Sequence, residues 1–254
     1  MTGTGASIFE SADWYDRGID WDARLGREIP FLRNVMGPPG QLGLLDAGCG
    51  TGRHAVAMAR EGYGVVGLDS GQDMLRLAAA HAVGAGAEVR WVRSPYETLA
   101  DAVGQSFDGV YCIGNSLAAA GNVEAVRQAV GNIAAVLRPG GRLVVHVLNF
   151  DAMRAEQPCV RGPRISRVES VEYVSFRVFH FGSSHAEITN VTAWNDGQWR
   201  CRSHGGRVYP VGHAELLAWL GDAGLRIDAC HADYQRSPFD PACQGDLIVV
   251  ATRS

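Results

Sequence analysis

The stretch that decides the fold of this chain is Leu44-Leu45-Asp46-Ala47-Gly48-Cys49-Gly50-Thr51-Gly52. The apolar residues 42–45 predict a buried strand, and residues 53–60 predict the start of a helix. The three glycines therefore form a turn between a strand and a helix, where glycine lets the backbone bend sharply and approach a ligand closely. Open α/β sheets bind ligands at such turns, at the carboxyl ends of their strands.

Short apolar runs alternate with helical patterns on both sides of this turn. The clearest helical spacing, three and four residues, ends at the breaker Arg138-Pro139-Gly140-Gly141 and involves Val123, Val126, Val130, Ile133 and Val136. We expect strands at residues 43–46, 64–69, 88–92, 107–113 and 142–149. This alternation predicts an α/β protein, a doubly wound Rossmann-like sheet, mostly parallel, with helices on both faces.

The pattern changes after Asp151. Residues 171–181 and 185–194 are rich in aromatic and β-branched side chains, and Asn195-Asp196-Gly197 is a turn signal. We therefore expect an antiparallel β lid, whose aromatic residues either form the second layer of a sheet or wall a substrate pocket. The main sheet resumes with a helix at 213–223 and strands at 225–231 and 246–251. The predicted organisation is a helical cap at 1–40, a main domain at 41–150 and 205–254, and a lid insertion at 151–204.

Composition excludes several classes of protein. The 254 residues carry a formal net charge of −4, so no general basic field favours nucleic acid as a partner. The sequence has no signal peptide pattern and no membrane-spanning run, so we expect a cytoplasmic protein without a membrane partner. The six cysteines form no CxxC pair, and the lid histidines have no metal-ligand spacing, so no metal is expected. The sequence is compatible with a homo-oligomer and does not fix the number of subunits.

The glycine spacing discriminates between nucleotide ligands. A dinucleotide fingerprint, G-x-G-x-x-G, would require glycine at position 53, where this chain has Arg53. Asp46 would repel a pyrophosphate but suits a ligand with an amino group and a sulfonium. Asp69, at the end of the second strand, can accept hydrogen bonds from both ribose hydroxyls. These features predict S-adenosylmethionine as the cofactor, with a nicotinamide-dependent dehydrogenase, a non-catalytic nucleotide-binding module and a ligand-free turn as alternatives.

Several motifs resemble those of the class I S-adenosylmethionine-dependent methyltransferases. Residues 46–52 resemble their motif I, residues 68–75 the segment after their second strand, residues 107–110 their fourth strand, and residues 137–141 the turn before their fifth. The resemblance covers roughly residues 40–150 and 205–252. It implies a seven-stranded sheet with a final antiparallel strand.

A narrower resemblance is to glycine N-methyltransferase and related small-molecule N-methyltransferases. It rests on Cys112-Ile113-Gly114-Asn115-Ser116, on Asn149-Phe150-Asp151, on Tyr15 in an N-terminal helix and on the β lid. It implies that Met74 packs on the adenine. The expected cofactor-binding residues are Tyr15, Asp46, Gly48, Cys49, Gly50, Gly52, Asp69, Ser70, Met74, Ser94, Pro95, Tyr96, Ile113 and Ser116.

Two positions depart from this family pattern. Ser94 and Pro95 stand where most class I enzymes have an acid that binds the adenine amino group, so Glu97 or a backbone group is expected to replace it. Leu148 stands where glycine methyltransferases have an arginine for the substrate carboxylate. We therefore expect an acceptor other than glycine or sarcosine.

The acceptor side is less well defined by the sequence. The expected catalytic residues are Tyr15, Asn115 and His146, and the expected substrate contacts are Trp21, Asn115, Asn149, Arg207 and Tyr209. Packing roles are the alternatives: Tyr15 in the cap, His146 as a satisfied core histidine, and Arg207 with Tyr209 between lid and core. Arg53 is expected to brace the cap.

The predicted reaction is in-line methyl transfer to a small molecule, catalysed mainly by alignment. The resemblance and the lack of an obvious strong base favour an amine nitrogen of a secondary metabolite, of the kind found in antibiotic biosynthesis, with oxygen or carbon as alternatives. Nucleic-acid base methylation is disfavoured because Asn115-Ser116-Leu117-Ala118 replaces the N/D-P-P-Y/F-type loop of those enzymes.

Overall fold

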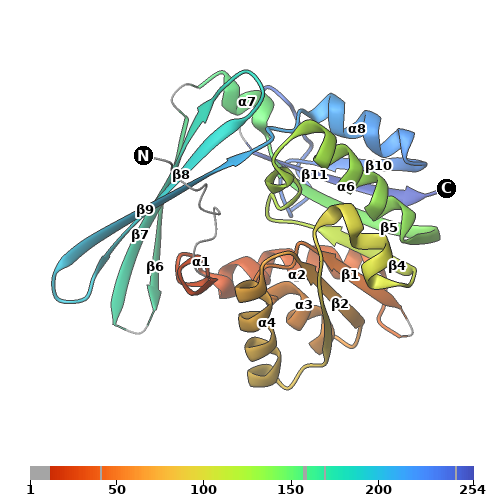
Figure 1. Cartoon of the computed structure of the whole chain (residues 1–254), viewed down its shortest axis with the longest axis horizontal. Coiled ribbons are helices and arrows are strands. Elements are labelled where there is room, and N and C mark those ends of the chain that lie inside the picture. Colours follow the sequence, from red (N-terminus) through yellow and green to blue (C-terminus); the bar gives the residue numbers. More distant parts are fainter. Residues whose placement is uncertain (1–11, 41, 157–158, 169, 244) are drawn as a thin grey trace.

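The fold is described from a computed structural model covering residues 12–40, 42–156, 159–168, 170–243 and 245–254. The main sheet has seven strands in the order β10-β11-β5-β4-β1-β2-β3 (Figure 1). The bounds of these strands are β1 Gly43–Ala47, β2 Gly64–Asp69, β3 Val89–Arg93, β4 Phe107–Cys112, β5 Leu137–Leu148, β10 Leu225–His231 and β11 Asp246–Arg253. Only β11 runs antiparallel to its neighbours, β5 and β10, which confirms the predicted Rossmann-like sheet with its antiparallel last strand. The strand order reverses between β1 and β4, where such sheets hold ligands.

Helices cover both faces of this sheet, as predicted. Adjacent residues of β1 alternate between the faces: Leu44 packs in the cluster that includes α2 and α3, and Leu45 in the cluster that includes α5, α6 and α8. The helices are α1 Ala12–Arg17, α2 Trp21–Met36, α3 Arg53–Arg60, α4 Gln72–Ala85, α5 Leu99–Val103, α6 Val123–Ala135, α7 Phe150–Arg154 and α8 His213–Asp222, with short 3-10 turns η1 Tyr96–Thr98 and η2 Leu117–Ala120. No helix within the described ranges is long and apolar enough to cross a membrane.

The expected break at residues 138–141 takes a different form. The strand β5 already begins at Leu137, and the register with β4 shifts, so that Phe107 pairs with Leu137 but Gly109 with Arg142. Gly140 has a φ of 76°, which accommodates the bulge. The breaker residues therefore kink a strand instead of forming a separate turn.

The lid is a second sheet of four antiparallel strands in the order β6-β7-β8-β9. Their bounds are β6 Cys159–Val168, β7 Val171–Phe181, β8 Ala186–Asn195 and β9 Trp199–Val208. The sequence indicated β7 and β8 but not β6 and β9, where Gly162-Pro163 and Gly205-Gly206 interrupt the strand pattern. Phe181 packs edge-on against Phe150 of α7, with ring centroids 6.3 Å apart, so one end of the lid is built into the core. The other end, with the β8–β9 turn, reaches away from the main sheet (Figure 1).

The two N-terminal helices have different roles. In α2, Phe31, Leu32 and Val35 are buried against the sheet, so this helix belongs to the main layer as well as to the expected cap. The shorter α1 contacts the lid, because Ser166 Oγ donates to the carbonyl of Arg17 at 3.1 Å. Residues 1–11 of the expected cap lie outside the described residues.

Candidate functional site

A cavity of about 980 Å³, partly open to solvent, lies at the carboxyl ends of β1, β2 and β4. Its floor is the glycine turn and its walls are the loop after β4, the first two helices and the lid. A second cavity adjoins it and shares its lining at Gly48, Asp69, Met74 and Ser116. The two cavities therefore form one elongated site that passes over the glycine turn.

The glycine turn is packed too tightly for larger residues. A Cβ at Gly48, whose φ is 78°, would lie 2.0 Å from Ser116 Oγ and 2.2 Å from the Tyr96 hydroxyl. A Cβ at Gly52 would lie 2.6 Å from Ala78 of α4 and does not face the cavity. Gly48 thus shapes the site directly, whereas Gly52 allows α3 and α4 to approach.

Two acids lie below this cavity. Asp69 accepts hydrogen bonds from the backbone N–H groups of Gly50 and Gly71, both at 2.8 Å. Asp46 is buried, and its Oδ2 has no hydrogen-bond partner among the residues that the structure describes. Burial, and secondly the Asp69 carboxylate, raise the pKa of Asp46 well above its ordinary value, and burial also raises the pKa of Asp69. A cationic ligand group would relieve this cost.

The far end of the site is formed by the segment after β3. Ser70, Ser94, Pro95, Tyr96 and Glu97 all line the second cavity. The Tyr96 hydroxyl contacts Ser116 Oγ at 2.8 Å and donates to the carbonyl of Ala47 at 3.2 Å. Tyr96 therefore ties this segment to both the glycine turn and the loop after β4.

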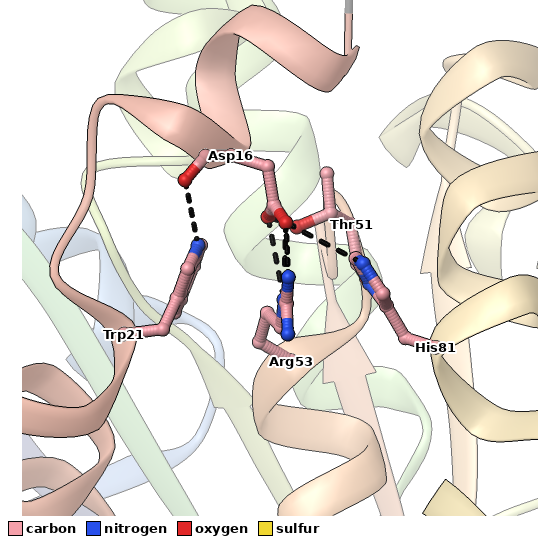
Figure 2. A network of polar contacts seen from close by, with 5 residues as sticks. All are labelled: Asp16, Trp21, Thr51, Arg53 and His81. Carbon is pink, nitrogen blue, oxygen red and sulfur yellow. Dashed lines mark hydrogen bonds and ion pairs between the residues drawn. The ribbon is translucent and has the colours of Figure 1, made fainter. Parts of the chain in front are cut away.

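A polar network attaches α1 to the glycine turn (Figure 2). The Asp16 carboxylate accepts a hydrogen bond from Thr51 Oγ1 at 2.7 Å, is ion-paired with Arg53, and lies 3.4 Å from His81 Nε2. Trp21 Nε1 donates to the Asp16 carbonyl at 3.1 Å. This network confirms that Arg53 braces the cap, and it holds the neighbouring Tyr15 at the cavity wall.

Comparisons with known proteins agree with this geometry. Residues 44–141 match a family described as a methyltransferase domain. The chain is 30% identical over 241 residues to a glycine/sarcosine N-methyltransferase of Parasynechococcus marenigrum, covering 92% of this chain and 80% of that protein. The chain belongs to the class I S-adenosylmethionine-dependent methyltransferases. It is a small-molecule methyltransferase, and its cofactor is S-adenosylmethionine.

Two further similar proteins have names that describe different methyl acceptors. The methyltransferase is 38% identical over 109 residues to a ubiquinone biosynthesis O-methyltransferase of Pectobacterium atrosepticum, covering 43% of this chain and 44% of that one. A solved amino pentose methyltransferase from Micromonospora echinaspora, involved in calicheamicin biosynthesis, has the same fold, with a TM-score of 0.74 and 24% identity over the full length of both chains.

Most of the expected cofactor-binding residues of the methyltransferase line the elongated site. Gly52 is the exception, because it packs against α4. Those in contact with one or both cavities are Tyr15, Asp46, Gly48, Cys49, Gly50, Asp69, Ser70, Met74, Ser94, Pro95, Tyr96, Ile113 and Ser116. Glu97 also lies there, as expected for a replacement of the missing adenine acid.

The expected acceptor-side residues divide into two groups. Tyr15, Trp21 and Asn115 line the cavity. Asn115 has a φ of 67°, and its Oδ1 accepts a hydrogen bond from the backbone N–H of Leu148 at 3.1 Å. This bond fixes the loop after β4 to the end of β5.

The other group lies outside the cavity lining. His146 Nδ1 is 3.2 Å from the N–H of Gly114 and 2.9 Å from the Tyr234 hydroxyl, so it supports the loop after β4 from behind. Its Nε2 lies 3.1 Å from Asp246. A positioning role therefore fits His146 better than a role as a base.

Asn149, Arg207 and Tyr209 have structural partners. Asn149 is buried, caps α7 through Ala152, and donates to the carbonyl of Cys243 at 2.9 Å. Arg207 is exposed and lies 3.6 Å from Glu187, and the Tyr209 hydroxyl donates to Glu215 at 2.8 Å. The structure brings none of the three to the cavity wall.

Other side chains at the wall were not expected from the sequence. A buried ion pair joins Arg24 to Glu28 at 3.0 Å, and the second Glu28 oxygen lies 2.7 Å from His54 Nε2. From the lid come Arg177, Ile188, Asn190, His204 and Val208. The i,i+4 spacing of Arg24 and Glu28 on an otherwise apolar helix face was a usable signal, whereas no motif marks Arg177.

Proposed function

We propose that this methyltransferase transfers a methyl group to an amine nitrogen of a small molecule held between the glycine turn and the lid. The supporting observation is the composition of the cavity wall. Its two carboxylates, Asp46 and Asp69, lie at the glycine turn. Of its two histidines, His54 has Nε2 2.7 Å from Glu28, and His204 of the lid is not free of partners either. An amine can lose its proton to water before it attacks, whereas a phenol or a carbon nucleophile needs a base in place.

The residues present fit the cofactor. Asp69 keeps lone pairs for the ribose hydroxyls beside its two backbone donors, and the unpartnered oxygen of Asp46 suits the amino group. Met74 and Tyr96 lie on the adenine side, with Ile113 and Ser116 along the loop after β4. The cofactor supplies a methyl group that its sulfonium has already activated. The protein then has to align the acceptor nitrogen, and Tyr15 and Asn115 are two polar groups of the wall that could do so.

The relatives support nitrogen as the acceptor atom. A glycine/sarcosine N-methyltransferase matches over most of its length, and the amino pentose enzyme has the same fold. Leu148 leaves the glycine-type carboxylate site without its arginine, which favours an acceptor such as an amino sugar or a related secondary-metabolite amine. Methylation of an oxygen is the second candidate, since the O-methyltransferase relative is 38% identical over 109 residues of this chain.

The acceptor class can be tested with the purified protein and S-adenosylmethionine. A panel of amino sugars, glycine, sarcosine and catechols is offered, and formation of the demethylated cofactor is measured together with the position of the new methyl group by mass spectrometry and NMR. We expect methylation on nitrogen of an amino sugar, with a rate that rises as pH increases through the amine pKa. Methyl transfer to catechol oxygen without transfer to any amine would refute the proposal.

A further inference from the structure

Arg177 of β7 lies where two cavities meet. It lines the cavity above the glycine turn. It also lines another cavity of about 820 Å³ beneath the lid, which is separate from the one formed by the segment after β3. Tyr15, Asn190 and His204 also line both, so these four side chains surround the passage between the cavities. A group bound at Arg177 would therefore face the glycine turn from the lid side.

The guanidinium of Arg177 has no ion-pair partner among the residues that the structure describes. In the ranges that the structure covers, no carboxylate lies within ion-pair distance of Arg177, whereas Arg24, the other arginine of the same cavity, is paired with Glu28 at 3.0 Å. Burial lowers the pKa of Arg177, and the nearby Arg164 and Arg24 lower it further, against opposite effects of Tyr15 and Asp246. Arg177 is half-buried, and the hydration that a cation loses in such a place has to be replaced by hydrogen bonds or an opposite charge.

The charge distribution separates the two ends of the site. Asp46 and Asp69 make the glycine turn acidic. The cavity beneath the lid has Arg164 and Arg177 in its lining, and the acid in that lining, Asp246, lies 3.1 Å from His146. The lid end is therefore complementary to an anion.

We propose that Arg177 binds an anionic group of the methyl acceptor, a carboxylate or a phosphate, and so determines acceptor specificity. The planar guanidinium matches both groups with two parallel N–H donors. This inference rests on the proposed function, in which the acceptor lies between turn and lid.

Anion binding can be measured without knowing the acceptor. The protein, saturated with the demethylated cofactor, is titrated with sodium phosphate and with sodium acetate at constant ionic strength and followed by NMR or calorimetry. We expect saturable binding of at least one anion to the wild type, at least tenfold weaker binding to Arg177→Gln, and intermediate binding to Arg177→Lys, which keeps the charge but loses the fork. The stronger of the two anions identifies the group.

The matched control is Arg200→Gln, which removes an exposed lid arginine that pairs with Asp196 at 3.3 Å. It should bind both anions as the wild type does. Unchanged affinity for the demethylated cofactor shows that each variant is folded. If Arg177→Gln does not fold, the comparison is made with Arg177→Lys. Equal anion binding by wild type and variant, or no anion binding by the wild type, would overturn the inference. Because the readout is binding, a finding of oxygen methylation would refute the proposed function and leave this result standing.

Discussion

At the scale of single residues, Asp46 carries the clearest conflict between folding and function. The fold buries its carboxylate and leaves Oδ2 without a hydrogen bond among the described side chains and backbone groups. An ionised carboxylate in that position is destabilised, so the apo fold shifts the protonation equilibrium of Asp46 toward the neutral form. A bound cationic group shifts the equilibrium back toward the carboxylate. Cofactor binding and the protonation of Asp46 should therefore be coupled.

The substitution Asp46→Asn tests this coupling. The folded state holds the Asp46 proton more tightly than the unfolded chain, because its pKa is raised. Apo stability should therefore fall as pH rises from the ordinary aspartate range through the raised pKa, and cofactor affinity should increase over the same range. In Asp46→Asn we expect a smaller pH dependence of both quantities and cofactor binding weakened by about tenfold, roughly the effect of one lost charge-assisted hydrogen bond.

Thermal unfolding and calorimetry over a pH series that begins below the ordinary aspartate pKa of about 3.9 would measure both effects. Asp101→Asn removes an exposed acid of α5 and should reproduce the wild-type curves. Identical cofactor affinity in Asp46→Asn and wild type at every pH would show that Asp46 does not contact the cofactor.

At the scale of elements, the short helix α1 depends on others for its position. Six residues cannot form a stable helix alone, so its place is set by tertiary contacts. Asp16 supplies three of them, with partners from three different elements: Thr51 in the glycine turn, Arg53 in α3 and His81 in α4 (Figure 2). The helix α1, which contacts the glycine turn through Asp16, thus also places Tyr15 at the cavity.

The substitution Asp16→Asn should loosen α1 while leaving the sheet intact. It removes the negative charge that Arg53 and His81 face and weakens the acceptor for Thr51. We expect cofactor affinity to fall by about tenfold and global stability by roughly 1–3 kcal/mol, the usual cost of leaving largely buried polar groups unsatisfied. Asp22→Asn, an exposed acid on α2, is the matched control. Wild-type cofactor affinity in Asp16→Asn would mean that α1 contributes nothing to binding.

At the scale of the whole molecule, prediction from the sequence succeeded where the signals are local. Strand runs, helix spacing and the Gly48–Gly52 turn are short-range patterns, and they specified the sheet, its layers and most of the cofactor end. The lid edges and the acceptor end depend on long-range contacts. The sequence alone makes His146 a candidate base, and only its contacts with Gly114 and Tyr234 in the folded protein indicate a positioning role. Arg177 has an ordinary place in an aromatic-rich strand, and only the fold brings it to a cavity.

The arrangement of the two sheets predicts a gradient of stability along the lid. At one end, Phe179 and Phe181 belong to the main core, whereas at the other end Trp199 is 60% exposed and the β8–β9 turn projects from the molecule (Figure 1). Backbone hydrogen bonds with few packed neighbours open more readily. Hydrogen exchange followed by mass spectrometry should therefore be slow in residues 177–188 and faster in residues 192–202. Uniformly slow exchange along β8 and β9 would contradict this. Adding the demethylated cofactor should slow exchange in residues 12–17 and 43–52, because these line or hold its site, and should change the projecting end of the lid least.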